Sequence, residues 1–278
     1  MKNRLTFLGT GTSQGVPMIG CNCEVCKSSD PRDKRLRASV FIEYEGLKIL
    51  VDAGPDFRQQ LLREDIFSVD AILLTHNHKD HTGGLDDIRA FNYFDKKATD
   101  IYCEKYVEES LRQEYSYAFA EVKYPGAPEW NVHDIDENPF CINGVKIIPI
   151  RGKHYKLPVL GYRFGDIAYC TDMNHIADEE FAKLQDLDHF IINCVRRGRH
   201  ISHFSLEGAL EVARRVGARH TWITHLSHQL PRHAVLEAEL QAILSSEPSS
   251  DQSKEPSSDQ STHQTTSILP AYDGLVIE

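Results

Sequence analysis

The residues best suited to chemistry lie in the segment Thr75-His76-Asn77-His78-Lys79-Asp80-His81. Three imidazoles and one carboxylate occur here within six residues, directly after an apolar run. Loops at strand ends of α/β folds present side chains to a shared cleft. Imidazole with carboxylate suits zinc, and also manganese or iron at a more oxygen-rich site. A histidine-rich surface turn is the structural alternative, but the complete His-X-His-X-Asp-His cluster favours a metal site.

A site with two metals needs more ligands than this loop holds, and three further candidates follow later predicted strands. His154 comes shortly after the strand at 146–150, Asp172 directly after the strand at 167–171, and His225 after another strand. Each of them alone is more often a capping or core polar residue. Their positions at successive strand ends favour a common metal site.

Runs of β-branched residues and helical periodicity predict the elements that must position these side chains. Strands are predicted at 5–8, 39–44, 48–51, 70–75, 145–150, 161–164, 167–171, 190–195 and 221–224, with a further strand pattern in 268–278. Helices are predicted at 104–114, 178–184, 206–216 and 232–244. Ser205 suits the N-cap of the third helix and Gly217 its C-terminal stop. Strands interleaved with helices predict an α/β layered architecture.

A second cluster, Cys21-Asn22-Cys23-Glu24-Val25-Cys26, has the spacing Cys-X-Cys-X-X-Cys. In a reducing compartment such a cluster more often binds zinc than forms disulfides, although reduced and unliganded cysteines are the alternative. Three cysteines leave a tetrahedral zinc one ligand short. We predict His228 as the fourth ligand, because it lies three residues after His225. Such a closed site is structural and not catalytic.

One segment differs in composition from the rest. Glu-Pro-Ser-Ser-Asp-Gln-Ser begins at Glu247 and again at Glu255. The repeat has almost no apolar side chain to bury and cannot offset its ordering entropy. We therefore interpret 245–267 as a low-complexity loop within a single domain that spans 1–278.

Charge and hydropathy exclude several classes of partner. The formal net charge is −10, from 31 basic and 41 acidic residues, which argues against a nucleic acid as partner because backbone binding usually needs a basic surface. No apolar run is long enough to span a membrane, and the N-terminus has no signal-peptide core. We expect a cytoplasmic protein with a small substrate.

The histidine cluster and its later partners resemble the metallo-β-lactamase-fold hydrolase superfamily over nearly the whole chain. The resemblance implies a four-layer αβ/βα sandwich with two divalent metals at one edge, between two sheets. It assigns one metal to His76, His78 and His154, the other to Asp80, His81 and His225, and makes Asp172 the bridge between them.

Two divalent cations about 3.5–4 Å apart hold a bridging hydroxide that is nucleophilic at neutral pH. Asp80 is the candidate that both binds a metal and orients this hydroxide. In phosphodiesterases of this superfamily, a histidine ahead of a helix serves as the general acid, and His203 matches that position. The arginines of the same loop are candidates for phosphate binding, and a solvated basic loop is the alternative.

The opening Gly9-Thr-Gly11, with Gln14-Gly-Val-Pro17, the cysteine cluster and the late Thr224-His-Leu-Ser-His228, resembles the PhnP-type phosphodiesterases. This resemblance implies hydrolysis of a small phosphodiester, cyclic ones included, with manganese or zinc in the active site and one structural zinc. A homodimer is compatible with it. PqqB proteins share the cysteine pattern, so the substrate stays open. The aromatic stretch 91–130 has no counterpart in this pattern and is a candidate wall of the cleft.

Three other functions compete with this interpretation. A tRNA 3′-processing nuclease shares the seven ligands but would need a basic arm that this acidic chain lacks. Thioester or lactam hydrolysis is compatible with the same scaffold. A non-catalytic metal carrier is the alternative of another class, and the complete ligand set with His203 argues against it.

Overall fold

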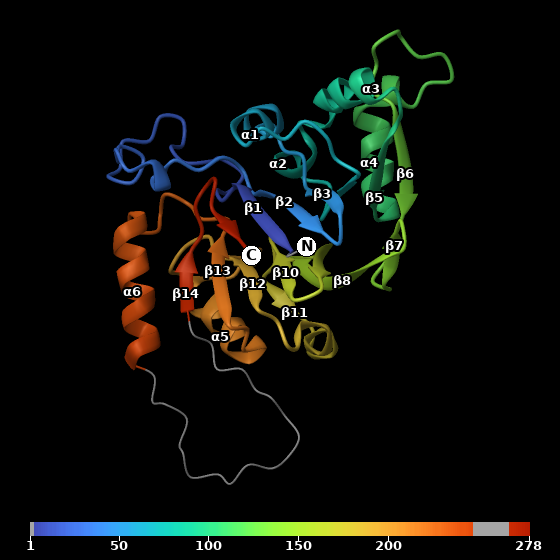
Figure 1. Cartoon of the computed structure of the whole chain (residues 1–278). Helices are drawn as coiled ribbons and strands as arrows, with labels where there is room; N and C mark the ends of the chain where they lie inside the picture. The colour runs from blue at the N-terminus through green and yellow to red at the C-terminus, as the bar shows by residue number, and fades with distance from the viewer. Residues whose placement is uncertain (1–2, 247–266) are drawn as a thin grey trace.

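Two β-sheets lie face to face with helices covering their outer faces, so that the chain forms four layers (Figure 1). The computed structural model describes residues 3–246 and 267–278. The predicted four-layer αβ/βα sandwich is confirmed. Most of the predicted low-complexity loop at 245–267 lies outside the described residues.

The first sheet consists of strands from the N-terminal half of the chain together with the C-terminal strand β15, in the order β15-β1-β2-β3-β4-β5-β6. β1 to β3 pair antiparallel, and β3 to β6 pair parallel. Its strands are β1 (Arg4–Gly9), β2 (Ser39–Tyr44), β3 (Leu47–Val51), β4 (Ala71–Leu73), β5 (Thr99–Cys103), β6 (Trp130–Asp134) and β15 (Val276–Ile277).

The second sheet has the order β11-β8-β9-β10-β12-β13-β14, with β7 paired to β8. β8 to β10 pair antiparallel, and β10, β12, β13 and β14 pair parallel. Its strands are β7 (Phe140–Ile142), β8 (Val145–His154), β9 (Leu157–Phe164), β10 (Ile167–Cys170), β11 (His175–Ile176), β12 (His189–Asn193), β13 (His220–Thr224) and β14 (Ser267–Pro270).

Helices cover the outer face of each sheet. The α-helices are α1 (Phe57–Arg63), α2 (Lys79–Thr82), α3 (Arg89–Asp95) and α4 (Lys105–Glu114) beside the first sheet, and α5 (Leu206–Val216) and α6 (His233–Ser246) beside the second (Figure 1). Among the described residues, no helix has the length and apolarity needed to cross a membrane.

Both faces of the central strands are buried, which is why they read as continuous apolar runs. In β3, Ile49 and Val51 face the core between the two sheets, while Leu50 faces the core under α1 and α4. Tyr162 and Tyr169 are fully buried between the sheets. This packing fixes the strand ends, and therefore the loops that follow them, in one plane at the edge of the sandwich.

The helix predicted at Asp178–Leu184 is present with the same bounds, as a 3-10 helix. The predicted end of β8 needs correction. β8 continues past Ile150, so that His154 is the last residue of the strand and not part of a following loop. The predicted α5 is confirmed, with the Ser205 hydroxyl accepting from the Gly208 N–H and Gly217 in the left-handed conformation.

Candidate metal centre

The histidine cluster lies at the carboxyl end of β4 and runs into the short helix α2. His78 is the N-cap of α2, and Asp80 lies in its first turn. The segment after β3 approaches α2 so closely that a Cβ at Gly54 would lie 2.0 Å from the Asp80 carbonyl oxygen. Only glycine permits that approach, and it brings Asp80 and His81 down onto the end of β3.

Asp52 follows β3 and orients the cluster from below. Its carboxylate accepts from the Thr75 N–H at 2.9 Å and from the Thr75 hydroxyl at 2.9 Å. The oxygen that accepts from this hydroxyl, Oδ2, also contacts His81 Nδ1 at 2.6 Å. The contact fixes the His81 ring and leaves Nε2 as its free ligand atom. Sequence reasoning missed Asp52, although an acidic residue directly after a buried strand was the available signal.

The first group of ligand atoms comes from His76, His78 and His154. The ring centroids of His76 and His78 are 4.6 Å apart, and those of His78 and His154 are 5.0 Å apart. His154 Nδ1 donates to the Ser202 carbonyl at 2.9 Å. His76 Nδ1 lies 2.9 Å from the Thr75 hydroxyl. Both bonds leave Nε2 facing the shared centre.

The second group comes from Asp80, His81, Asp172 and His225. Asp172 lies between His81 and His225. His81 Nε2 is 3.2 Å from one of its carboxylate oxygens, and His225 Nε2 is 3.1 Å from the other. Asp80 Oδ2 is 3.3 Å from His81 Nε2. Asp172 and His225 both have positive φ, 55° and 57°. Non-glycine residues held there store strain that is typical of functional sites.

Several polar atoms of these groups have the environment that a cation requires. The Nε2 atoms of His76, His81 and His225 are buried and form no well-aligned hydrogen bond with the described residues. A buried imidazole nitrogen without a partner is costly unless a ligand satisfies it. The residues present therefore fit two divalent metals, because neutral imidazoles and ionised carboxylates are the ligating forms.

The pKa shifts of the cluster go in both directions. Burial acts to lower the pKa of His81 and of His225, but Asp172 outweighs it and raises the pKa of His81 well above its ordinary value and that of His225 to about 9. A cation bound to these two rings would have to displace their protons. Burial acts to raise the pKa of Asp172, but His225 and His81 outweigh it and hold this pKa well below its usual range. Burial and the neighbouring His81 lower the pKa of His76 well below its ordinary value. The site thus keeps the Asp172 carboxylate ionised and the His76 ring neutral.

His203 lies beside both groups, just ahead of α5. Its ring centroid is 4.6 Å from that of His154 and 4.8 Å from that of His225. Its Nδ1 is 3.7 Å from Asp172 Oδ1. Burial, together with nearby His225, lowers the pKa of His203 to about 3. The predicted general acid is therefore brought to the edge of the metal centre.

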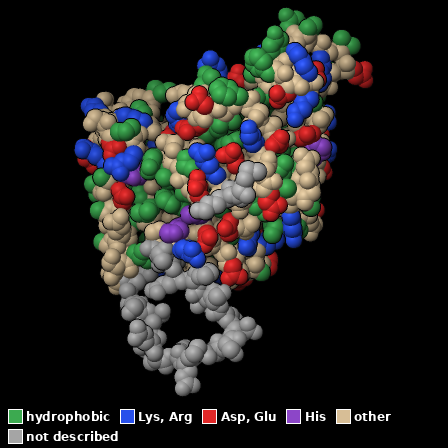
Figure 2. Space-filling model, viewed as in Figure 1, with side chains coloured by type: hydrophobic (Ala, Val, Ile, Leu, Met, Phe, Trp, Pro, Cys, Tyr) green, Lys and Arg blue, Asp and Glu red, His purple; other side chains and the backbone are tan. Residues whose placement is uncertain are grey.

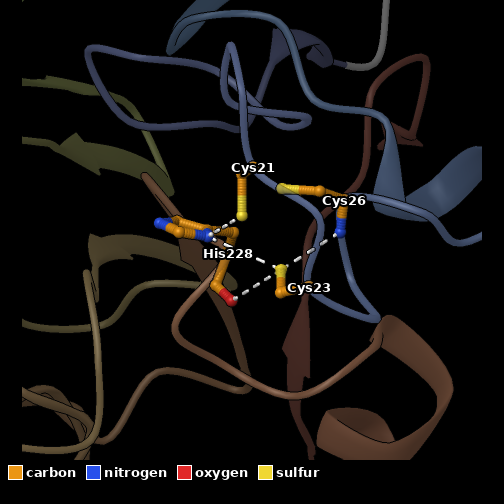
Figure 3. Close-up of side chains that lie close together, drawn as sticks. All are labelled: Cys21, Cys23, Cys26 and His228. Carbon is orange, nitrogen blue, oxygen red and sulfur yellow. Dashed lines mark hydrogen bonds between the residues drawn. The ribbon is translucent and has the colours of Figure 1, made fainter.

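The cysteine cluster forms a separate site with His228. Figure 3 shows Cys21, Cys23 and Cys26 from one loop pointing toward His228 from another segment. Cys21 Sγ and Cys23 Sγ lie 3.2 and 3.6 Å from His228 Nδ1. Tetrahedral zinc with Zn–S and Zn–N bonds near 2.3 and 2.0 Å separates such atoms by roughly 3.5 Å. The donor set and its spacing fit one zinc ion.

The environment of the site has opposite effects on the pKa values of Cys23 and Cys26. The Cys26 N–H donates to Cys23 Sγ at 3.4 Å and lowers the pKa of Cys23 to about 6. Burial raises the pKa of Cys26 to about 11, although the Met18 N–H donates to its sulfur. His228 lies three residues after His225, so one short segment contributes to both metal sites.

The stretch 91–130 contacts the histidine loop through α4. Asn77 Nδ2 donates to the Ser110 hydroxyl at 2.8 Å, and Lys79 pairs with Glu114 at 2.6 Å. These contacts tie the loop to the helix layer. The role of the stretch in specificity stays a prediction.

Comparison with known proteins places this geometry in a family. The Beta-lactamase superfamily domain matches residues 48–226. A solved structure, described as a new diphosphatase from the PhnP family, is 36% identical and covers 100% of this chain and 97% of its own, with a TM-score of 0.84. Zn(2+)-bound PqqB from Methylobacterium extorquens has the same fold, with 16% identity, coverage of 99% of each chain and a TM-score of 0.73.

A curated relative carries a different name. The chain is 42% identical over 233 residues to a protein of Porphyromonas gingivalis named octanoyltransferase, which is 83% of this chain and 47% of that protein. The chain thus spans about half the length of this relative. The domain match and the full-length structural match both agree with the two sheets and the convergent ligands described above. The chain therefore belongs to the β-lactamase superfamily of metallohydrolases and is related to the PhnP family within it.

Proposed function

We propose that this chain is a metal-dependent phosphodiesterase that hydrolyses a small phosphodiester, cyclic ones included. The observation that carries the proposal is the position of Asp172, whose two carboxylate oxygens face His81 and His225 while the histidine triad lies alongside. A full-length relative in the PhnP family, described as a diphosphatase, supports chemistry at phosphorus.

In this proposal the residues of the two groups would hold two divalent cations, manganese or zinc. His76, His78 and His154 would hold one of them, Asp80, His81 and His225 would hold the other, and Asp172 would serve both. When bound, the cations make water nucleophilic at neutral pH and offset charge on the phosphoryl oxygens. A zinc held by Cys21, Cys23, Cys26 and His228 has a structural role.

Two side chains act on the reacting atoms. Asp80 accepts a hydrogen bond from the attacking water and orients it toward phosphorus. His203, at the edge of the centre beside Asp172, is placed to give a proton to the leaving oxygen. Because burial lowers its pKa to about 3, this role requires that the negative charge of the bound phosphoryl compound raise that pKa. Burial keeps bulk water away from this proton transfer, since both His203 and Asp172 are largely enclosed.

Surface charge supports a small substrate. The net charge is −10, and Figure 2 shows basic and acidic side chains interspersed on the face that it draws. A polynucleotide backbone is attracted by a continuous basic surface. A single phosphoryl group needs only the local charge of bound cations.

A diphosphate is the second candidate substrate, because the PhnP-family relative is described as a diphosphatase. Both reactions place water against phosphorus and release an oxygen leaving group, so the same residues would serve. The name of the Porphyromonas relative gives weaker support to octanoyl chemistry, since the match covers only 47% of that protein.

The test is to quantify bound metals in the purified protein and to assay bis(p-nitrophenyl) phosphate with added manganese. Asp80→Ala should lose at least about 100-fold in turnover, because it removes a ligand and the water-orienting carboxylate. Asp70→Asn, which changes a carboxylate outside the site, is the matched control.

An inorganic diphosphate and an octanoyl thioester are assayed in parallel. The proposal fails if metals bind in the expected amount but neither phosphoryl compound is cleaved. Cleavage of the thioester alone would assign the site to acyl chemistry instead.

A further inference from the structure

A groove opens beside the histidine triad, and most of its lining residues have no role in the proposed chemistry. It has a volume of about 660 Å³, and two of the triad, His78 and His154, lie on its wall. The remaining lining comes from the turn between β8 and β9, from Ile201 and Ser202, and from Asn77. A substrate whose phosphorus sits at the metal centre would place its organic group here.

Tyr155 is the most prominent side chain of this groove. It directly follows His154, and it is 51% exposed. Ile201 on the facing loop is 64% exposed. Single exposed apolar side chains are ordinary on protein surfaces. Two of them facing one groove at the edge of a metal centre form an apolar surface that a ligand can cover.

Tyr155 has a backbone conformation that costs energy for a residue with a side chain. Tyr155 and Lys156 are the two residues of the hairpin turn, since His154 pairs with Leu157. Tyr155 has a φ of 59°, a region that costs energy for side chains and favours glycine in such turns. Tyr155 thus occupies this turn position at a cost in stability, and it is also part of the lining of the groove.

Asn174 holds the two walls of the groove in place. Its Oδ1 accepts from the Tyr155 N–H at 3.0 Å, and its Nδ2 donates to the Ile201 carbonyl at 2.8 Å. Its own N–H donates to the Lys153 carbonyl at 2.8 Å. Since Asn174 lies two residues after Asp172, the same segment positions the metal centre and the groove. The walls are therefore preorganised relative to the reacting phosphorus.

Lys156 adds a positive charge at the rim. Its Nζ lies 5.3 Å from the centroid of the Tyr155 ring, and its side chain is exposed. A flat apolar ring at the edge of the metal centre suits a substrate that joins an aromatic group to the phosphate bound there, and the Lys156 charge adds attraction for such an anion. Base–aromatic stacking is tolerant of base identity and is worth about 1–3 kcal/mol per base.

We infer that Tyr155 is a specificity-determining residue and that the groove takes a nucleobase, so that the substrate is a mononucleotide-sized phosphoryl compound. This inference rests on the proposed function for the position of the reacting phosphorus. It goes further in naming the organic group of the substrate and the residue that selects it.

The experiment compares two cyclic phosphates with the same reacting ring, adenosine 2′,3′-cyclic phosphate and glycerol 1,2-cyclic phosphate. The full-length, metal-loaded protein is tested as wild type, as Tyr155→Gly and as Tyr155→Phe. Glycine suits the φ of the turn, so this variant removes the ring without adding strain. Tyr124→Ala, which removes an exposed aromatic side chain outside the groove, is the control.

Tyr155→Gly should raise KM for the adenosine compound about tenfold, as expected for the loss of one stacking contact, and leave the glycerol compound unchanged. Tyr155→Phe should behave as wild type. Equal effects on both compounds, or none on either, would overturn the inference.

A binding measurement separates this inference from the proposed function. Calorimetry on the same proteins compares adenosine 5′-monophosphate with inorganic phosphate. If wild type cleaves neither cyclic compound but binds the nucleotide more tightly in a Tyr155-dependent way, the groove assignment stands and phosphodiester hydrolysis does not. If the nucleotide binds no more tightly than phosphate, the nucleobase assignment is wrong.

Discussion

At the scale of single residues, Asp52 decides how His81 is presented. The 2.6 Å contact to His81 Nδ1 and the two bonds from Thr75 fix both the tautomer and the ring plane. Asp52→Asn keeps the shape but loses the charge and can no longer accept equally from all three donors. We expect a 10- to 100-fold loss, roughly, in metal affinity or turnover, as for other carboxylate partners of ligating histidines.

The measurement is a chelator competition for the bound metals, alongside phosphodiester turnover. Asp70→Asn serves as the control, because Asp70 accepts from the Lys48 N–H and is remote from the ligands. Unchanged affinity and turnover in Asp52→Asn would show that the contact to His81 has only a packing role.

Most of the candidate ligands could be predicted from the sequence, because their signal is local. The histidine cluster and the three cysteines each carry their spacing within one short segment. Asp52 and Asn174 could not be found in this way, since their partners are Thr75, His81 and Ile201 on other segments. Residues that act through such long-range hydrogen bonds have no spacing of their own.

At the scale of elements, the end of β3 and the start of α2 meet through a glycine. A Cβ at position 54 would lie 2.0 Å from the Asp80 carbonyl oxygen, which is backbone and cannot move aside alone. Gly54→Ala should therefore shift α2 and lower the free energy of unfolding by about 1–3 kcal/mol, with a larger loss of turnover.

Urea denaturation of the metal-loaded protein measures this change. Gly198→Ala is the matched control, because nothing lies within 4 Å of a Cβ there and its φ is not in the left-handed region. Comparable stability of the two variants would mean that the segment adjusts without cost and that the close approach does not position the metal ligands.

The N-terminus of α5 offers a second prediction at this scale. The Ser205 hydroxyl caps the helix by accepting from the Gly208 N–H at 3.2 Å, two residues after His203. Ser205→Ala should lower the free energy of unfolding by about 1 kcal/mol. Ser205→Asp, which retains a capping oxygen, should restore most of it in the same denaturation experiment. Failure of the aspartate to restore stability would argue against the capping role.

The ends of a helix or strand could be predicted from the sequence where nearby residues determine them. α5 was predicted correctly because Ser205 and Gly217 mark its two ends within the helix itself. The extension of β8 was not, because Gly152 interrupts the pattern of β-branched residues. That glycine is required by a distant neighbour, since a Cβ there would lie 2.3 Å from Met173 Sδ. Packing from across the fold made the strand longer than its own residues indicate.

At the scale of the whole molecule, the cysteine site joins the loop after β1 to the segment after β13. Because His228 follows His225 closely, zinc bound there would also restrain a proposed active-site ligand. An ion present at about a thousand times its Kd stabilises the folded state by about 4 kcal/mol. Cys23→Ser should lose one zinc per chain and much of that stabilisation.

Metal analysis and thermal denaturation of Cys23→Ser test this, with Cys141→Ser as control, because Cys141 is exposed and outside the cluster. We also expect weaker binding of the active-site metals in Cys23→Ser. An unchanged metal count would show that the cysteines bind no zinc.

A buried polar network ties together three distant parts of the chain and gives the protein a defined response to acid. Arg35 is buried, donates to the Ala271 carbonyl at 2.6 Å and lies 3.1 Å from His233 Nδ1. The His233 N–H donates to Asp33 Oδ1 at 2.7 Å. Burial, together with the charge of Arg35, lowers the pKa of His233 to about 4. Protonation of His233 would place two positive charges side by side in the core.

An unfolded histidine takes up its proton near pH 6.5, whereas His233 in the folded protein does so only near pH 4. Between these values the unfolded chain binds more protons, so stability must fall as the pH falls through this window and level off below it. The full effect is roughly 3 kcal/mol. His233→Gln, whose amide oxygen can accept from Arg35, should lose that much less stability between pH 7 and pH 4 in urea denaturation. Since both proteins carry the same metal ligands, acid release of metal affects them alike, and the difference in slope isolates His233. Parallel pH profiles would mean that the network relaxes around the charged ring, so that protonation of His233 does not destabilise the fold.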